Sequence, residues 1–309
     1  MPITKIAKWL QSGVHLIQED LGYSPVTLHH AIESYSNFLP VIEPTPQSIH
    51  AGSMVRWHEW GDRRFRPTMF AKHNIMYGWR FSQGHYSSFE LAMPEFDDFG
   101  QCEIVPAWQC EIQDVVGFSS SKSDLQQFTD LDQFAQARTP NWIEEITEEN
   151  LLRNLAHSEI RIGNELHADT TTDHFCRYRW DGRTFLMNDG GSHHFAAARY
   201  IADKLNRKVY LNGKLKIYSI NPSSVEALRE RFDILVIDDS AEEQNQFHQA
   251  MKAFSATYLW RKLPPPHENS RAIFLPKNET RSRTVAANLK TAGTYDLAAL
   301  LQAIVEQQT

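Results

Sequence analysis

The segment 184–201 joins three local patterns in an order that restricts how the chain can fold. A short apolar run at 184–187 is typical of a β-strand. The sequence Asn-Asp-Gly-Gly follows at 188–191, and its glycines permit backbone conformations that other residues avoid. Alanines and aromatic residues over 195–201 then predict a helix that begins directly after this turn. A strand is therefore expected to lead straight into the first turn of a helix.

The start of this predicted helix is a favourable place for an anion. The first N–H groups of a helix have no partner within it, and the helix macrodipole concentrates partial positive charge there. Glycine has no Cβ, so the backbone can approach a phosphate closely. We therefore expect phosphate binding at Gly190, Gly191, Ser192 and His193. The residues also allow an ordinary strand–turn–helix connection that binds no ligand.

Polar side chains around the turn are candidates for chemical roles. Asp189 can hold Mg²⁺ on a bound nucleotide, or it can equally stabilise the turn. Ser192 can contact a phosphate or act as a nucleophile, although a serine at this position commonly caps the helix. Either His193 or His194 can donate to a ligand oxygen. The two do not easily share one ligand, because adjacent helix residues point about 100° apart.

The same segment resembles the ParB/sulfiredoxin superfamily, whose members place Gly-Gly-Cys-His-Arg or Gly-x-Arg-Arg between a strand and a helix. The matching letters here are Asp-Gly-Gly-Ser-His-His-Phe-Ala-Ala at 189–197. A predicted strand at 216–220 and a predicted helix at 225–231 continue the order that is found in the family. The resemblance covers about residues 140–238. It implies a mixed-sheet core and a bound nucleotide, ATP or CTP, with Mg²⁺.

In this superfamily such sites act as CTP switches, as kinases and, in sulfiredoxins, with ATP. The resemblance therefore implies a nucleotide-binding protein, with hydrolysis or phosphotransfer as its reaction and Asp189, Ser192 and His193 as catalytic candidates. Asp189 is also the candidate metal ligand. The candidate nucleotide-contacting residues are Gly190, Gly191, Ser192, His193 and His194.

Two positions depart from the family pattern. Ser192 stands where sulfiredoxins have their catalytic cysteine, so reduction of cysteine sulfinic acid by that thiol is excluded. His194 stands where a phosphate-binding arginine is usual, and a neutral imidazole binds phosphate more weakly than a bidentate guanidinium. These departures leave the resemblance in fold intact, but they do not point to any one activity of the family.

Composition limits the setting in which the protein works. The net charge of −7 argues against a global electrostatic attraction to nucleic acid. Three cysteines without Cys-x-x-Cys spacing argue against a disulfide scaffold or a zinc ribbon. No apolar run approaches the length of a membrane span. We therefore expect a cytoplasmic protein without a membrane partner.

One local segment nevertheless has a composition that is compatible with a nucleic-acid partner. Arginines and aromatic residues interleave there, namely Arg56, Trp57, Trp60, Arg63, Arg64 and Arg66. Such residues can pair with phosphates and stack on the bases of single strands, but they also build ordinary cores. The alternative function is therefore a non-enzymatic DNA- or protein-associated factor, with the fold as a scaffold.

The whole pattern predicts an α+β protein with a ParB/sulfiredoxin-like mixed-sheet core and a C-terminal α/β extension within 141–309. An N-terminal helical and then strand-rich region is expected over 1–140, since short apolar and aromatic runs occupy 50–118. Asp181-Gly182 and Asn212-Gly213 predict the turns of two hairpins.

Overall fold

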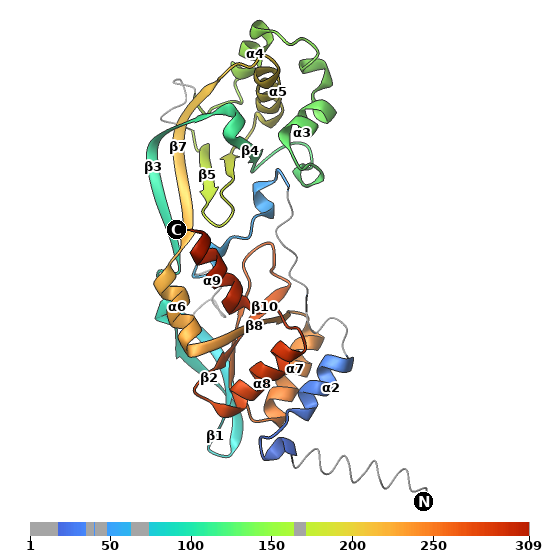
Figure 1. The fold of residues 1–309 in the computed structure, drawn as a ribbon, viewed down its shortest axis with the longest axis vertical. Coiled ribbons are helices and arrows are strands. Elements are labelled where there is room, and N and C mark those ends of the chain that lie inside the picture. The colour runs from blue at the N-terminus through green and yellow to red at the C-terminus, as the bar shows by residue number, and fades with distance from the viewer. Residues whose placement is uncertain (1–17, 35–39, 41–47, 63–73, 164–170, 309) are drawn as a thin grey trace, which may run out of the picture.

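The computed structural model describes residues 18–34, 40, 48–62, 74–163 and 171–308. The protein is α+β, and its helices pack against two five-stranded sheets that follow one another along the long axis of the molecule (Figure 1). None of the helices in the described part of the chain is long and apolar enough to cross a lipid bilayer.

The lower sheet has the order β2-β1-β9-β10-β8, and every pair in it is antiparallel. Its strands are β1 (Ile75–Ser82), β2 (His85–Ala92), β8 (Phe232–Asp238), β9 (Tyr258–Lys262) and β10 (Ser270–Pro276). One face packs against α2 (Val26–Ser34), α7 (Ala241–Ala253) and α8 (Thr280–Thr291). The other face packs against α6 (Pro222–Arg231) and α9 (Leu297–Gln307). The apolar sequence of β8 follows from this burial on both faces.

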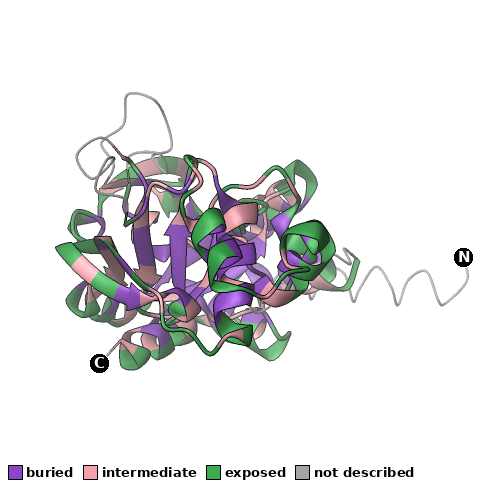
Figure 2. Cartoon of the chain, turned by 90° about the horizontal axis from the view of Figure 1, so that it is seen from above, coloured by how far each residue is buried: buried purple, intermediate pink, exposed green. Residues whose placement is uncertain are grey.

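The upper sheet has the order β3-β7-β5-β6-β4 and is mixed. Its strands are β3 (Gly100–Glu111), β4 (Val115–Phe118), β5 (His174–Tyr178), β6 (Thr184–Met187) and β7 (Tyr210–Ile220). Three helices pack with one face of it, namely α3 (Leu131–Arg138), α4 (Glu148–Leu155) and α5 (Ser192–Lys204). Figure 2 shows buried residues concentrated on the strands and on the helix surfaces that cover them.

Both sheets draw strands from both sides of residue 140. β1 pairs with β9 in the lower sheet, while β3 and β4 join β5, β6 and β7 in the upper sheet. The boundary expected between residues 140 and 141 therefore does not coincide with a division between the sheets. Between 50 and 62, two 3-10 turns (Ala51–Ser53 and Trp57–Glu59) stand where the apolar pattern was typical of a strand.

The two predicted hairpin turns have different outcomes. β5 and β6 pair antiparallel around Asp181 and Gly182, which confirms the first hairpin. The second hairpin is wrong, because β7 runs without interruption through Asn212 and Gly213. A Cβ on Gly213 would lie 2.4 Å from Cδ1 of Ile162. This glycine therefore permits a close approach across the strand rather than a turn.

Candidate functional site

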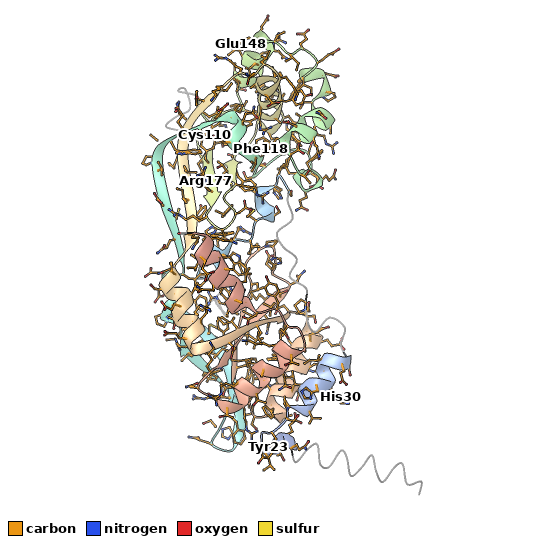
Figure 3. All side chains as sticks on the ribbon, viewed as in Figure 1. Tyr23, His30, Cys110, Phe118, Glu148 and Arg177 are labelled. Carbon is orange, nitrogen blue, oxygen red and sulfur yellow. The ribbon has the colours of Figure 1, made fainter. Side chains whose placement is uncertain are left out.

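The site is built where two parallel strands end side by side. β4 and β6 are parallel neighbours, so the loop 119–124 and the turn 188–191 leave the sheet at the same edge. In sheets of this kind ligands gather beyond the carboxyl ends of the strands. Phe118, labelled in Figure 3, ends β4 and packs edge-on against Phe195 of α5, with 5.4 Å between the ring centroids.

Asn188 connects the two loops. Its side-chain amide donates to the carbonyl oxygens of Ser120 (3.0 Å) and Gly190 (2.8 Å). Its backbone N–H donates to Oγ of Ser119 at 2.9 Å, and that hydroxyl donates to the carbonyl of Asn188 at 3.1 Å. Asn188 is buried, so these bonds satisfy its polar atoms and fix the spacing of the two loops.

The residue at the start of α5 must be a glycine, because any side chain there would strain the backbone. Gly191 is the N-cap with φ of +76°, and no side chain caps the helix there. The first intrahelical bond runs from Phe195 N–H to the carbonyl of Gly191 at 2.9 Å. The N–H groups of Ser192, His193 and His194 therefore precede the intrahelical hydrogen-bond ladder. Ser192 is the first helical residue, so the capping role considered for it falls to Gly191.

An oxyanion already lies on this turn. Gly191 N–H donates to Oε2 of Glu159 at 3.1 Å, and Nζ of Lys122 lies 3.9 Å from Oε1 of the same carboxylate. The Gly191 hydrogen bond, and next the charge of Lys122, hold the pKa of Glu159 below its usual range. Both side chains are exposed to solvent, with 44% of Glu159 and 88% of Lys122 accessible.

Three serines and one histidine form a chain of polar contacts across the two loops. Oγ of Ser192 donates to Oγ of Ser121 at 2.9 Å and lies 3.4 Å from Nδ1 of His193. Nε2 of His193 lies 3.0 Å from Oγ of Ser123. Burial, and next the charges of Lys122 and Arg138, lower the pKa of His193. The imidazole is therefore neutral at neutral pH.

His194 faces a different neighbourhood. Its ring is stacked between Trp142, at 4.1 Å, and His157, at 3.6 Å between centroids. Its Nδ1 lies 3.0 Å from Oδ1 of Asn154 in α4. The structure thus brings His193 to the serine loop and His194 to α4. Only the backbone N–H of His194 is left to serve the turn.

Asp189 lies at the turn but is engaged by a basic side chain. Its Oδ2 is 3.3 Å from Nη1 of Arg161, and its backbone N–H donates to Oδ1 of Asp173 at 3.1 Å. Within the described residues no three His, Cys, Asp or Glu side chains come together as a metal site. Asp189 therefore has an ion pair and a backbone hydrogen bond at the turn.

The tryptophans of the arginine-aromatic segment are core residues. Trp57 is 2% exposed and Trp60 is fully buried, with its indole N–H donating to the carbonyl of Lys262 at 2.7 Å. These two rings therefore have no exposed face on which a base could stack. The prediction that Trp57 and Trp60 stack on bases is wrong. Arg56 lies 3.5 Å from Glu59. Arg63, Arg64 and Arg66 lie outside the described residues.

Sequence reasoning did not find four of the side chains that shape the site: Ser121, Lys122, Ser123 and Glu159. A local signal existed for three of them, since Ser-Ser-Ser-Lys-Ser at 119–123 directly follows the strand β4. The parallel pairing of β4 with β6 brings this loop to α5, and no local pattern reveals it. Glu159 arrives from the segment after α4 and has no motif around it.

Comparison with known proteins gives one match. No curated protein and no solved structure is significantly similar to this chain. The model of a family of unknown function, DUF6685, matches residues 105–309. This range is more than half of the chain and contains every residue placed at the β4–β6 edge above. The chain therefore belongs to the DUF6685 family, whose function is unknown.

Proposed function

We propose that the protein binds the phosphate groups of a nucleotide at the edge where β4 and β6 end. The observation that carries this proposal is the hydrogen bond from Gly191 N–H to the Glu159 carboxylate, at 3.1 Å. A backbone amide at a helix start that holds a carboxylate can hold a phosphate oxygen in the same place. The incoming phosphate displaces Glu159, whose exposed ion pair with Lys122 contributes little stability.

The surrounding groups support phosphate rather than another ligand. The N–H groups of Ser192 and His193 follow Gly191 in the first turn of α5. Lys122 provides a positive charge within reach of the same turn, and Ser121 and Ser123 add hydroxyl donors. Phosphate binding by backbone amides, a lysine and hydroxyls is a recurrent combination in proteins.

We further propose a ParB/sulfiredoxin-like core and a phosphoryl-transfer reaction. The order β6, α5, β7, α6 supports the resemblance to the ParB/sulfiredoxin superfamily, and with it ATP or CTP with Mg²⁺ as the ligand. Hydrolysis or phosphotransfer is the proposed reaction. Of the candidate catalytic groups, His193 is best placed, because its neutral imidazole contacts a hydroxyl while Asp189 is paired with Arg161.

Calorimetry and thermal unfolding with ATP, CTP, GTP and ADP, each with and without Mg²⁺, test the proposal. A ligand at 100 times its dissociation constant stabilises the folded state by about 2.7 kcal/mol. Lys122→Ala is expected to weaken binding without harm to the fold, because this side chain is 88% exposed. Lys208→Ala is the matched control, since Lys208 is 68% exposed and pairs with Glu111 at the end of β3 in the upper sheet.

A second candidate function is a scaffold that binds no nucleotide. The same Glu159 carboxylate favours it, because it satisfies the Gly191 N–H from within the chain. The variant Glu159→Gln separates the two. Nucleotide binding that is stronger than in the wild type supports the phosphate site, whereas no binding by either protein supports the scaffold.

A further inference from the structure

We propose that Ser123 is a nucleophile that accepts the terminal phosphoryl group of the bound nucleotide, with His193 as its general base. This inference rests on the proposed function, and it adds the acceptor of the phosphoryl group. The contact that carries it joins Oγ of Ser123 and Nε2 of His193 at 3.0 Å. A hydroxyl within hydrogen-bond reach of an imidazole is the arrangement that makes serine nucleophilic in enzymes.

The hydrogen-bond chain is compatible with the tautomer that a base requires. Ser192 donates its hydroxyl proton to Ser121, so the Ser192 oxygen is free to accept from Nδ1–H of His193. With the proton on Nδ1, Nε2 carries a lone pair and accepts the hydroxyl proton of Ser123. Ser192 therefore acts as a positioning residue for His193, and Ser123 replaces it as the candidate nucleophile.

The surroundings keep His193 neutral and hold its ring. Lys122 and Arg138 place positive charge near the imidazole, and Glu159 opposes them, but burial has the largest effect on its pKa. Phe134 lies 5.1 Å and Trp142 lies 6.4 Å from the His193 ring, centroid to centroid. An aromatic wall of this kind limits the orientations of the ring, so that Nε2 faces the serine loop.

Ser123 is itself held in the loop that bears the phosphate ligands. Its backbone N–H donates to Oγ of Ser121 at 3.1 Å, which closes a short turn around Lys122. Ser123 and the proposed phosphate ligand Lys122 are neighbours in sequence. A phosphate held by Lys122 and the first turn of α5 is therefore close to the hydroxyl that attacks it.

The step balances without a further reactant. The Ser123 oxygen forms a bond to the γ-phosphorus while the bond from that phosphorus to the bridging oxygen breaks. The nucleoside diphosphate leaves with the electron pair of the broken bond, and Nε2 of His193 takes the hydroxyl proton. The Mg²⁺ that accompanies the nucleotide offsets the charge on the phosphates.

The experiment is mass-spectrometric mapping of phosphoserine after the full-length protein is incubated with ATP or CTP and Mg²⁺. Phosphate is expected on Ser123 of the wild-type chain, so no variant has to fold for the test to decide. His193→Gln is expected to slow its formation by about 100-fold or more, the usual contribution of a general base. Ser120→Ala is the control and should leave the rate unchanged, because this exposed loop residue contributes only backbone atoms to the described hydrogen bonds.

Three outcomes overturn the inference. Nucleotide that binds by calorimetry but leaves no phosphate on Ser123 excludes the acceptor role and leaves the proposed function intact. Phosphate on another serine, or an undiminished rate in His193→Gln, excludes the Ser123–His193 pair. Absence of nucleotide binding removes the proposed function together with the inference.

Discussion

At the scale of single residues, Glu159 determines whether the Gly191 amide is available to a ligand. Its carboxylate accepts from Gly191 N–H at 3.1 Å and thereby occupies the position proposed for a phosphate oxygen. A residue that competes with the ligand is expected to weaken binding. In Glu159→Gln the negative charge is gone, so nucleotide affinity should rise by about 3- to 10-fold, or roughly 1 kcal/mol.

Calorimetry of Glu159→Gln measures this effect. Glu148→Gln is the matched control, because Glu148 lies on α4 (Figure 3) and pairs at 3.2 Å with Arg207, outside the described site. Unchanged or lower affinity in Glu159→Gln contradicts the competition, and an equal gain in the control shows that net charge alone is responsible.

Glu159 also predicts a pH dependence of stability. Its pKa is lowered in the folded state, first by the Gly191 hydrogen bond and then by Lys122. Its contribution to stability is therefore present above the ordinary glutamate pKa of about 4.3 and is lost as the pH falls through the lower folded value. The difference in unfolding temperature between wild type and Glu159→Gln should be largest near neutral pH and disappear in acid.

The titration of His193 is expected to affect the rate of phosphoserine formation rather than the stability of the fold. Burial, then Lys122 and Arg138, lower its pKa below the ordinary value of about 6.5, while Glu159 raises it. Phosphoserine formation should therefore rise with pH through a midpoint below 6.5 and stay level above it. A pH profile that is the same in His193→Gln contradicts the role of the imidazole as base.

At the scale of elements, the sequence predicted those strands, turns and helices that depend on interactions between neighbouring residues. The strand, glycine turn and helix over 184–201 exist as β6 and α5, and the Asp-Gly hairpin joins β5 to β6. Asn212-Gly213 failed as a turn because β7 continues through both residues, which pair with the distant strand β3. The loop after β4 could not be assigned to the site, since only the long-range parallel pairing with β6 places it there.

The start of α5 makes a prediction at this scale. In Gly191→Ala the new Cβ would lie 2.8 Å from the carbonyl oxygen of Glu159, in a left-handed conformation that costs about 1–2 kcal/mol for other residues. Gly182 has a similar φ of +78°, with no atom within 4 Å of the position of a Cβ.

Urea denaturation of Gly191→Ala and Gly182→Ala separates the clash from the backbone strain. Gly191→Ala should lose more free energy of unfolding than Gly182→Ala, and only Gly191→Ala should lose nucleotide binding. Equal losses in the two variants would show that nothing approaches the Gly191 turn closely.

At the scale of the whole molecule, each sheet combines strands from both sides of residue 140. β7 crosses the upper sheet and leads through α6 into β8 of the lower sheet, while Trp60 packs in the lower core with Phe96, Phe99 and Phe274. Composition could not distinguish this core role from base stacking, because the same arginine-aromatic pattern serves both. Burial decides it, since a ring without exposed surface cannot receive a base.

Trp60→Ala tests this assignment. Removing a fully buried tryptophan should lower the free energy of unfolding by about 3–5 kcal/mol. Trp142→Ala is the control and should cost less, because Trp142 is 39% exposed. A small loss of unfolding free energy in Trp60→Ala, together with weaker binding to single-stranded DNA, would show that this segment is a nucleic-acid interface.

If phosphate binds where β4 and β6 end, the Gly191 amide is the group that senses it first. Selective ¹⁵N labelling of the 14 glycines gives a spectrum in which Gly191 can be followed while ATP or CTP with Mg²⁺ is added. Saturable shifts of the Gly190 and Gly191 amides, with Gly182 unmoved, are predicted. Nucleotide binding by calorimetry with the Gly191 amide unmoved would place the ligand elsewhere and contradict a phosphate site at the start of α5.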